Sequence, residues 1–116
     1  MKNLKVVKID SESIEFENGI KLYSEHQSDC CEHHYLSFED LELSDFEDLE
    51  FDLSGDGFFK RIEDYGIELV PNKGFTVKVP GYGYNNGYYS HELTLCLIGE
   101  GFNREYDITE CQVVEG

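Results

Sequence analysis

The feature that most constrains the fold is the alternation of apolar and polar residues on both sides of Asn18-Gly19. The run SIEFE precedes this pair and IKLYSE follows it. Ile14 and Phe16 alternate with Glu15 and Glu17, and Ile20 and Leu22 alternate with Lys21 and Tyr23. A period of two is typical of half-buried strands. Asn-Gly between two such runs is a strong hairpin signal, because both residues tolerate positive φ. The sequence therefore predicts an antiparallel hairpin here, with LKVVKID as a further strand before it.

Strand patterns return in the second half of the chain. The runs IELVP and FTVKVP flank NKG, which predicts a second hairpin. HELTLCLIG and REYDITECQVV also alternate and are joined across EGFN. The glycines of PGYGYNNGYYS mark tight backbone turns, so this stretch is expected to be a loop.

Two short helices are expected between these groups of strands. Ser44 lies three residues before Glu47, which resembles a capping box, and Phe46 and Leu49 share one helical face, so we predict a helix near residues 45–50. FFKRIEDYG predicts a second helix that ends at its glycine. The expected fold class is α+β, mostly antiparallel β-sheet with one or two short helices. A length of 116 residues suits a single domain, residues 1–116.

Negative charge is concentrated in the middle of the chain. The formal net charge is −16, and no Lys or Arg lies between Lys21 and Lys60. Such a chain repels nucleic acid and anionic membranes and attracts basic partners. Acidity that only maintains solubility is the alternative. We predict that a basic partner binds the carboxylates of Glu39, Asp40, Glu42, Asp45, Glu47 and Asp48.

Cellular location is inferred from hydropathy. No apolar run reaches the length of about 20 residues that crosses a bilayer, and the start of the chain lacks the apolar core of a signal peptide. We therefore expect a cytoplasmic protein, whose cysteines are thiols or metal ligands rather than disulfides.

A cluster of cysteines and histidines predicts a metal site. Cys and His are the usual ligands of zinc, and five of them fall within nine positions. The polar loop that contains them is expected to hold one structural zinc ion. Cys96, Cys111 or His91 could supply a distant ligand, although Cys96 alone fits a small buried apolar residue. The predicted ligands are His26, Cys30, Cys31 and His34, with His33 as the substitute.

The stretch DLSGDGFFKRIE, residues 52–63, partly matches a calcium-binding loop of the EF-hand kind. Asp52, Asp56 and Glu63 occupy the first, fifth and twelfth positions of an EF-hand loop. Lys60 occupies the ninth, and the helix that would follow Glu63 ends almost at once. We therefore predict no tight calcium binding, and a turn that opens a helix instead.

Several segments resemble a family of small, uncharacterised phage and bacterial proteins. They are FENGIKLYSEH, CCEHHYL, LEFDLSGDGFFKRIEDYGIELVP and PGYGYNNGYYS, and the resemblance runs from about Phe16 to Cys111. In size, charge and its Cys/His cluster the chain also resembles zinc-binding type II anti-CRISPR proteins.

This resemblance implies a non-enzymatic inhibitor in the host bacterial cytoplasm. Its partner would be an RNA-guided nuclease of a type II CRISPR system, and binding would block the loading of target DNA. We find no convincing catalytic centre, since the consecutive residues Ser90, His91 and Glu92 do not converge as a triad does. Two alternatives stay open, namely a zinc-dependent hydrolase with Glu32 as its base and an acidic metal-binding interaction module.

Overall fold

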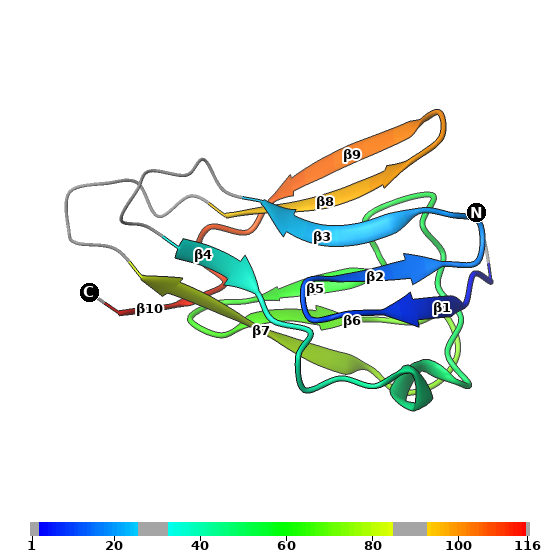
Figure 1. Cartoon of the computed structure of the whole chain (residues 1–116), viewed down its shortest axis with the longest axis horizontal. Helices are drawn as coiled ribbons and strands as arrows, with labels where there is room; N and C mark the ends of the chain where they lie inside the picture. The colour runs from blue at the N-terminus through cyan, green and yellow to red at the C-terminus, as the bar shows by residue number, and fades with distance from the viewer. Residues whose placement is uncertain (1–2, 26–32, 85–92, 116) are drawn as a thin grey trace.

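The strands of the protein form two stacked β-sheets. The computed structural model describes residues 3–25, 33–84 and 93–115. One sheet has the strand order β1-β2-β3-β8-β9, and the other has the order β10-β7-β6-β5, with β4 also paired to β7 (Figure 1). The elements are β1 (Val6–Ile9), β2 (Ser13–Phe16), β3 (Lys21–Glu25), β4 (His33–Leu36), the 3-10 turn η1 (Leu43–Phe46), β5 (Phe59–Ile62), β6 (Gly66–Leu69), β7 (Val77–Tyr84), β8 (Thr94–Gly99), β9 (Phe102–Asp107) and β10 (Val113–Glu115).

The hairpin predicted at Asn18-Gly19 is confirmed. Strands β2 and β3 pair in antiparallel fashion, with Ile14 opposite Leu22, and both of these side chains are buried. Gly19 has a φ of 88°, in the left-handed region that glycine enters without steric cost. The local pattern and the turn residue therefore suffice to form this part of the sheet.

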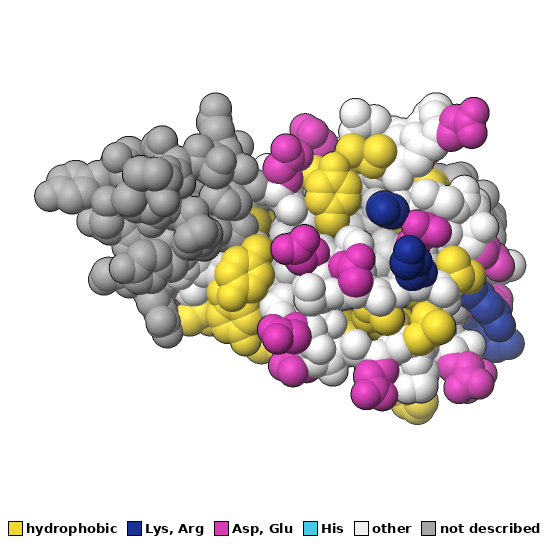
Figure 2. Space-filling model, in the orientation of Figure 1, with side chains coloured by type: hydrophobic (Ala, Val, Ile, Leu, Met, Phe, Trp, Pro, Cys, Tyr) yellow, Lys and Arg dark blue, Asp and Glu magenta, His cyan; other side chains and the backbone are white. Residues whose placement is uncertain are grey.

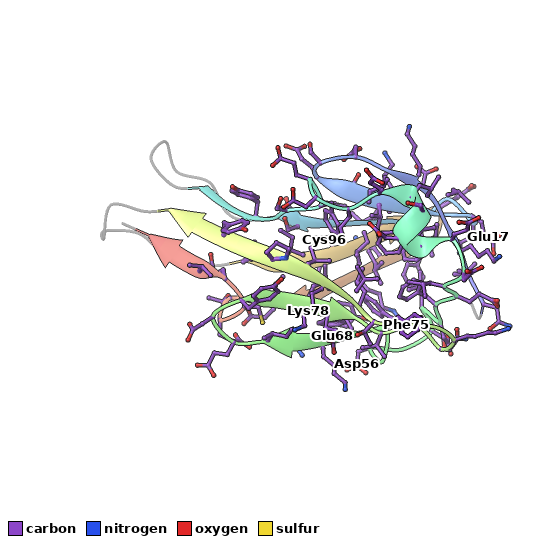
Figure 3. The ribbon with its side chains drawn as sticks, turned by 90° about the horizontal axis from the view of Figure 1, so that it is seen from below. Glu17, Asp56, Glu68, Phe75, Lys78 and Cys96 are labelled. Atoms are coloured by element: carbon purple, nitrogen blue, oxygen red, sulfur yellow. The ribbon has the colours of Figure 1, made fainter. Side chains whose placement is uncertain are left out.

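Apolar side chains from both sheets fill the space between them. The turned view in Figure 3 shows the two layers edge-on, with side chains packed between them. Aromatic contacts extend this core, since the rings of Phe16 and Phe51 lie 5.7 Å apart and those of Phe58 and Tyr106 lie 5.8 Å apart. The resulting molecule measures 42 × 28 × 22 Å.

The second predicted hairpin is also present. Strands β6 and β7 pair in antiparallel fashion, with Leu69 opposite Val77, and Gly74 in the connection has a φ of 105°. At the other end of this pair, a Cβ atom at Gly66 would overlap the backbone carbonyl oxygen of Val79. The close approach of β7 therefore requires glycine at position 66.

The expected α+β class is not confirmed, because the structure is mainly β. The described residues contain one 3-10 turn and no α-helix, and no described helix is long and apolar enough to cross a membrane. The helix predicted near residues 45–50 is a shorter turn that begins earlier, at Leu43. Its first turn is closed by Asp45, whose carboxylate accepts a hydrogen bond of 2.8 Å from the backbone N–H of Glu42.

The helix predicted from FFKRIEDYG is wrong, because this stretch forms β5 and a tight turn into β6. Phe59 pairs with Leu69, and Ile62 pairs with Gly66. Asp64 in the turn has a φ of 61°. Apolar residues three apart share one face of a helix but lie on opposite faces of a strand, and pairing with β6 overrides this local preference.

Two further predictions require correction. The first half of the predicted loop PGYGYNNGYYS continues strand β7 as far as Tyr84. The predicted strand REYDITECQVV is divided between the two sheets, because β9 ends at Asp107 and β10 runs parallel to β7, with Val113 opposite Tyr82. The carboxylate of Asp107 accepts a hydrogen bond of 3.0 Å from the N–H of Thr109, which turns the chain from one sheet to the other.

Candidate functional site

The predicted zinc ligands lie mostly outside the described residues. His26, Cys30 and Cys31 belong to the segment 26–32, which the structure does not describe. The backbones of His33 and His34 begin strand β4, opposite Tyr84 and Gly83 of β7. Their side chains are not described, so the zinc site of residues 26–34 stays a prediction.

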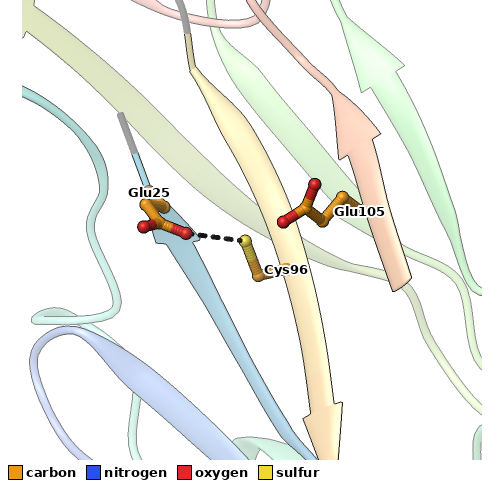
Figure 4. Close-up of side chains that lie close together, drawn as sticks. All are labelled: Glu25, Cys96 and Glu105. Atoms are coloured by element: carbon orange, nitrogen blue, oxygen red, sulfur yellow. Dashed lines mark hydrogen bonds between the residues drawn. The ribbon is translucent and has the colours of Figure 1, made fainter. Parts of the chain in front are cut away.

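Three other side chains of the kinds that bind metals lie close together on the first sheet. Glu25 of β3, Cys96 of β8 and Glu105 of β9 point toward one another from three neighbouring strands (Figure 4). Each offers one ligand atom, and these atoms all lie within 4.8 Å of one another. The Cys96 thiol donates a hydrogen bond of 3.6 Å to the Glu25 carboxylate. The residues are far apart in sequence, and only strand pairing brings them together.

The protonation of Cys96 argues against metal binding by this group alone. Burial raises the pKa of Cys96 to about 12, and the negative charge of Glu25 contributes to the increase. A cysteine binds metal as a thiolate, so the raised pKa opposes coordination near neutral pH. Cys111 is likewise a buried free thiol, and burial raises its pKa to about 11. Cys96 is buried, as expected, but it lies beside Glu25 and Glu105 and outside the hydrophobic core cluster.

The acidic segment, residues 39–48, runs along one edge of the two sheets and is held there by buried apolar side chains. Phe38, Phe46 and Leu49 are buried within and beside it. The N–H of Phe38 donates a hydrogen bond of 3.1 Å to the carbonyl oxygen of Ser11, and the N–H of Leu49 donates one of 3.1 Å to that of Phe46. The first bond ties the start of the segment to the connection between β1 and β2, and the second closes a turn at its end.

The six carboxylates predicted to bind a partner are all exposed. Alternate burial explains this, because the anchors point into the core while the acidic side chains between them point to solvent. Figure 2 shows acidic side chains along the lower edge of the molecule, where Figure 1 places η1. The group consists of Glu39, Asp40, Glu42, Asp45, Glu47 and Asp48.

An open apolar groove lies between strand β1 and the turn η1. Its lining consists of Val6, Val7, Leu43, Ser44 and Glu47, and its volume is about 470 Å³. Val7 and Leu43 are half-exposed here, whereas Val6 is buried. We call this feature the β1 groove. Because Glu47 belongs to both features, the apolar groove and the acidic segment form one continuous surface.

The stretch considered for calcium does not have the backbone of an EF-hand. Its carboxylate Asp52 accepts hydrogen bonds from the N–H and the hydroxyl of Ser54, at 3.0 and 2.6 Å, and closes a turn. The chain then enters β5 at Phe59 rather than the helix that was expected. That residues 52–63 do not bind calcium tightly stays a prediction.

The sequence predicts the acidic segment but not the groove beside it. The pair Val6-Val7 interrupts the alternation of β1 and marks the groove, since two adjacent apolar residues in a strand place one of them outside the core. The group of Glu25, Cys96 and Glu105 gave no such signal, because nothing in the sequence relates β3 to β8.

Comparison with known proteins adds no assignment. No family model, curated protein or solved structure matches this chain. The resemblance to small phage and bacterial proteins, and to zinc-binding type II anti-CRISPR proteins, stays a prediction.

Proposed function

We propose that this protein is a non-enzymatic inhibitor that binds the nucleic-acid-binding surface of another protein through its acidic segment. The partner expected from the sequence resemblance is an RNA-guided nuclease of a type II CRISPR system. The observation that supports the proposal is the exposure of six carboxylates in a segment of ten residues whose backbone is anchored by Phe38, Phe46 and Leu49. An anchored segment presents its charges in a fixed arrangement, which a disordered acidic tail does not.

Carboxylates in such an arrangement resemble the phosphates of a nucleic acid to a basic surface. Lys and Arg residues that otherwise contact phosphates would contact Glu and Asp instead. RNA-guided nucleases hold their heteroduplex in a positively charged channel. The net charge of −16 would accelerate encounter with such a channel at low salt. Occupation of the channel by the acidic segment would exclude target DNA.

The test is a titration of the protein against a type II nuclease, with DNA loading and DNA cleavage measured separately. Inhibition should reach completion near one protein per nuclease, and loading should be lost together with cleavage. Complete inhibition by trace amounts would indicate catalysis, as the zinc-dependent hydrolase alternative requires. No inhibition of any type II nuclease tested would refute this partner.

A charge-reversal variant tests the surface. It carries Lys at Glu39, Asp40, Glu47 and Asp48 and keeps Asp45, whose carboxylate closes the turn. Each exposed ion pair is worth about 0.2–1 kcal/mol, so the loss of four pairs should weaken binding at least about fourfold. The matched control carries Lys at exposed acidic positions elsewhere, which changes the net charge equally, namely Glu12, Glu63, Glu100 and Glu110. Equal weakening in both variants would show that overall charge, rather than the acidic segment, determines binding.

A further inference from the structure

Among the strands that the structure describes, β1 has one edge that is not paired with another strand. It is the last strand in its sheet, and β2 covers its other edge. In the described part of the chain, backbone hydrogen bonds reach this edge at its two ends, where Leu4 forms a bridge with Phe51 and where the N–H of Phe38 bonds to the carbonyl oxygen of Ser11, and the turn η1 lies beside it in between. Between these contacts, the described residues place no strand against β1. Unpaired N–H and C=O groups of an edge strand are a template for an added strand.

The β1 groove lies along this open edge and is apolar. The pairing of β1 with β2 shifts between Val6 and Lys8, so Val7 is an extra residue at a bulge. Val7 is 48% exposed and Leu43 is 44% exposed, and both line the groove. Edge strands usually carry charge at such positions to prevent pairing. Here the exposed Lys8 and the bulge protect the second half of the strand, and the apolar edge that remains consists of Val7 beside Leu43 of η1.

The charge around the groove favours a basic segment. Glu47 lines the groove itself, and the other carboxylates of the acidic segment flank η1. The nearest cation of the strand, Lys8, lines a separate small depression together with Glu15 and Lys21. A segment that enters the groove therefore meets apolar side chains in the middle and negative charge at the side.

We propose that the β1 groove binds an extended segment of the protein partner, which adds as a strand to the open edge of β1. The inference rests on the proposed function and specifies which element of the partner is recognised. Four residues of β1 extend about 13 Å, enough for a core of three or four partner residues. Apolar residues of this core would contact Val7 and Leu43, and flanking Lys or Arg would reach the acidic segment. Main-chain hydrogen bonds supply affinity in this mode, and the side-chain contacts supply specificity.

A second copy of the chain is a poorer occupant than a basic partner. Two chains with a net charge of −16 each repel one another, and an acidic rim would face an acidic rim. Electrostatic attraction therefore favours a basic segment, rather than a second copy of the chain, as the occupant of the β1 groove.

The test uses a synthetic probe of seven residues, with the sequence Lys-Lys-Val-Ile-Val-Lys-Lys and blocked ends. Titration into the isotope-labelled protein should shift the backbone amide signals of β1 and η1 in NMR spectra. A second probe of the same sequence is N-methylated at the first valine and at the adjacent isoleucine. The N–H groups of adjacent residues point to opposite edges of an extended chain, so each edge loses a main-chain donor while every charge and side chain is kept. It should bind at least about tenfold more weakly. Equal binding of both probes would refute strand addition and leave only charge attraction.

Variants of the groove provide the second measurement. Leu43→Ser should weaken binding of the first probe about fivefold, because it removes an apolar contact. The matched control is Ile98→Ser, which replaces a side chain of similar exposure, 38%, on β8. The control should bind the probe as the parent protein does. Loss of binding in both variants, or in neither, would refute the groove as the site.

These measurements are distinct from the nuclease titration. Absence of nuclease inhibition together with probe binding in the groove would refute the nuclease partner and retain strand addition. Inhibition that is unchanged in Leu43→Ser and lost on charge reversal would retain the acidic segment and refute the groove. A dimer that forms through β1, detected by sedimentation of the protein alone and abolished by Leu43→Ser, would refute the basic segment as occupant.

Discussion

Phe46 holds the acidic segment on the protein, and its truncation predicts a measurable loss of stability. The side chain is 1% exposed, and its ring centroid lies 6.5 Å from that of Phe51. Full burial of a phenylalanine side chain contributes about 1.5–3 kcal/mol, and the cavity left in Phe46→Ala adds a further cost. We expect a decrease of about 3–4 kcal/mol in the free energy of unfolding, which is a large fraction of the usual 5–15 kcal/mol.

Urea unfolding, followed by circular dichroism, measures this change. With a slope of about 1.5 kcal/mol per molar urea, the midpoint should fall by about 2 M. Leu43→Ala, on the same turn, is the matched control, because this side chain is 44% exposed and loses little contact. The control should lower the free energy of unfolding by less than about 1 kcal/mol.

Hydrogen exchange provides the local measurement. In Phe46→Ala, amide exchange should accelerate more in residues 38–50 than in the β2–β3 hairpin, since Phe46 and Phe38 anchor only that segment. A loss of stability below about 1 kcal/mol, or acceleration spread evenly over the chain, would refute the role of Phe46 as an anchor.

The remaining predictions concern the backbone, the thiols and the metals. Gly66→Ala should lower the free energy of unfolding by more than about 3 kcal/mol, because the added Cβ overlaps a carbonyl oxygen of β7. The control Gly55→Ala, which has open space around the added Cβ, should change the urea midpoint little. Above about pH 9, a cysteine in the unfolded chain ionises, whereas Cys96 in the folded protein, with its pKa raised to about 12, keeps its proton. The free energy of unfolding should therefore fall as the pH rises, by at most about 1.4 kcal/mol per pH unit for this thiol. A fall of the same size in Cys96→Ala would contradict this origin. Elemental analysis of protein prepared without chelator should find one zinc per chain, whose removal lowers the melting temperature, and finding none would refute the site in residues 26–34. Calorimetry should find no micromolar calcium site; such a site, lost in Asp52→Ala, would contradict the interpretation of that turn.

Sequence alone predicted the elements that local interactions determine. Asn18-Gly19 closes the β2–β3 hairpin, and the two flanking alternations allow only one register with the apolar face inward. The hairpin around Gly74 follows from the same two signals. The exposure of the acidic segment was predictable too, because carboxylates remain in water unless they are paired.

Other elements depend on partners that are distant in the sequence. Residues 59–62 have apolar positions with a spacing that suits a helix, and they form β5 because they pair with β6. Strand β10 leaves the sheet of β9 and pairs with β7, since the turn at Asp107 redirects the chain. Neither outcome follows from the local pattern, because the pairing free energy resides in contacts between segments.

Of the two surface features, the acidic segment follows from the sequence and the β1 groove from the tertiary structure. The sequence by itself determined the acidic segment, whose charges adjoin one another along the chain. Only the tertiary structure decided that this segment lies beside the open edge of β1, so that Leu43 and Val7 form a groove next to Glu47. It also placed Glu25 beside Cys96, where burial raises the pKa of the thiol to about 12. The physical reason is that charge and alternation are properties of adjacent residues, whereas a groove and a perturbed pKa arise from the packing of residues that are far apart along the chain.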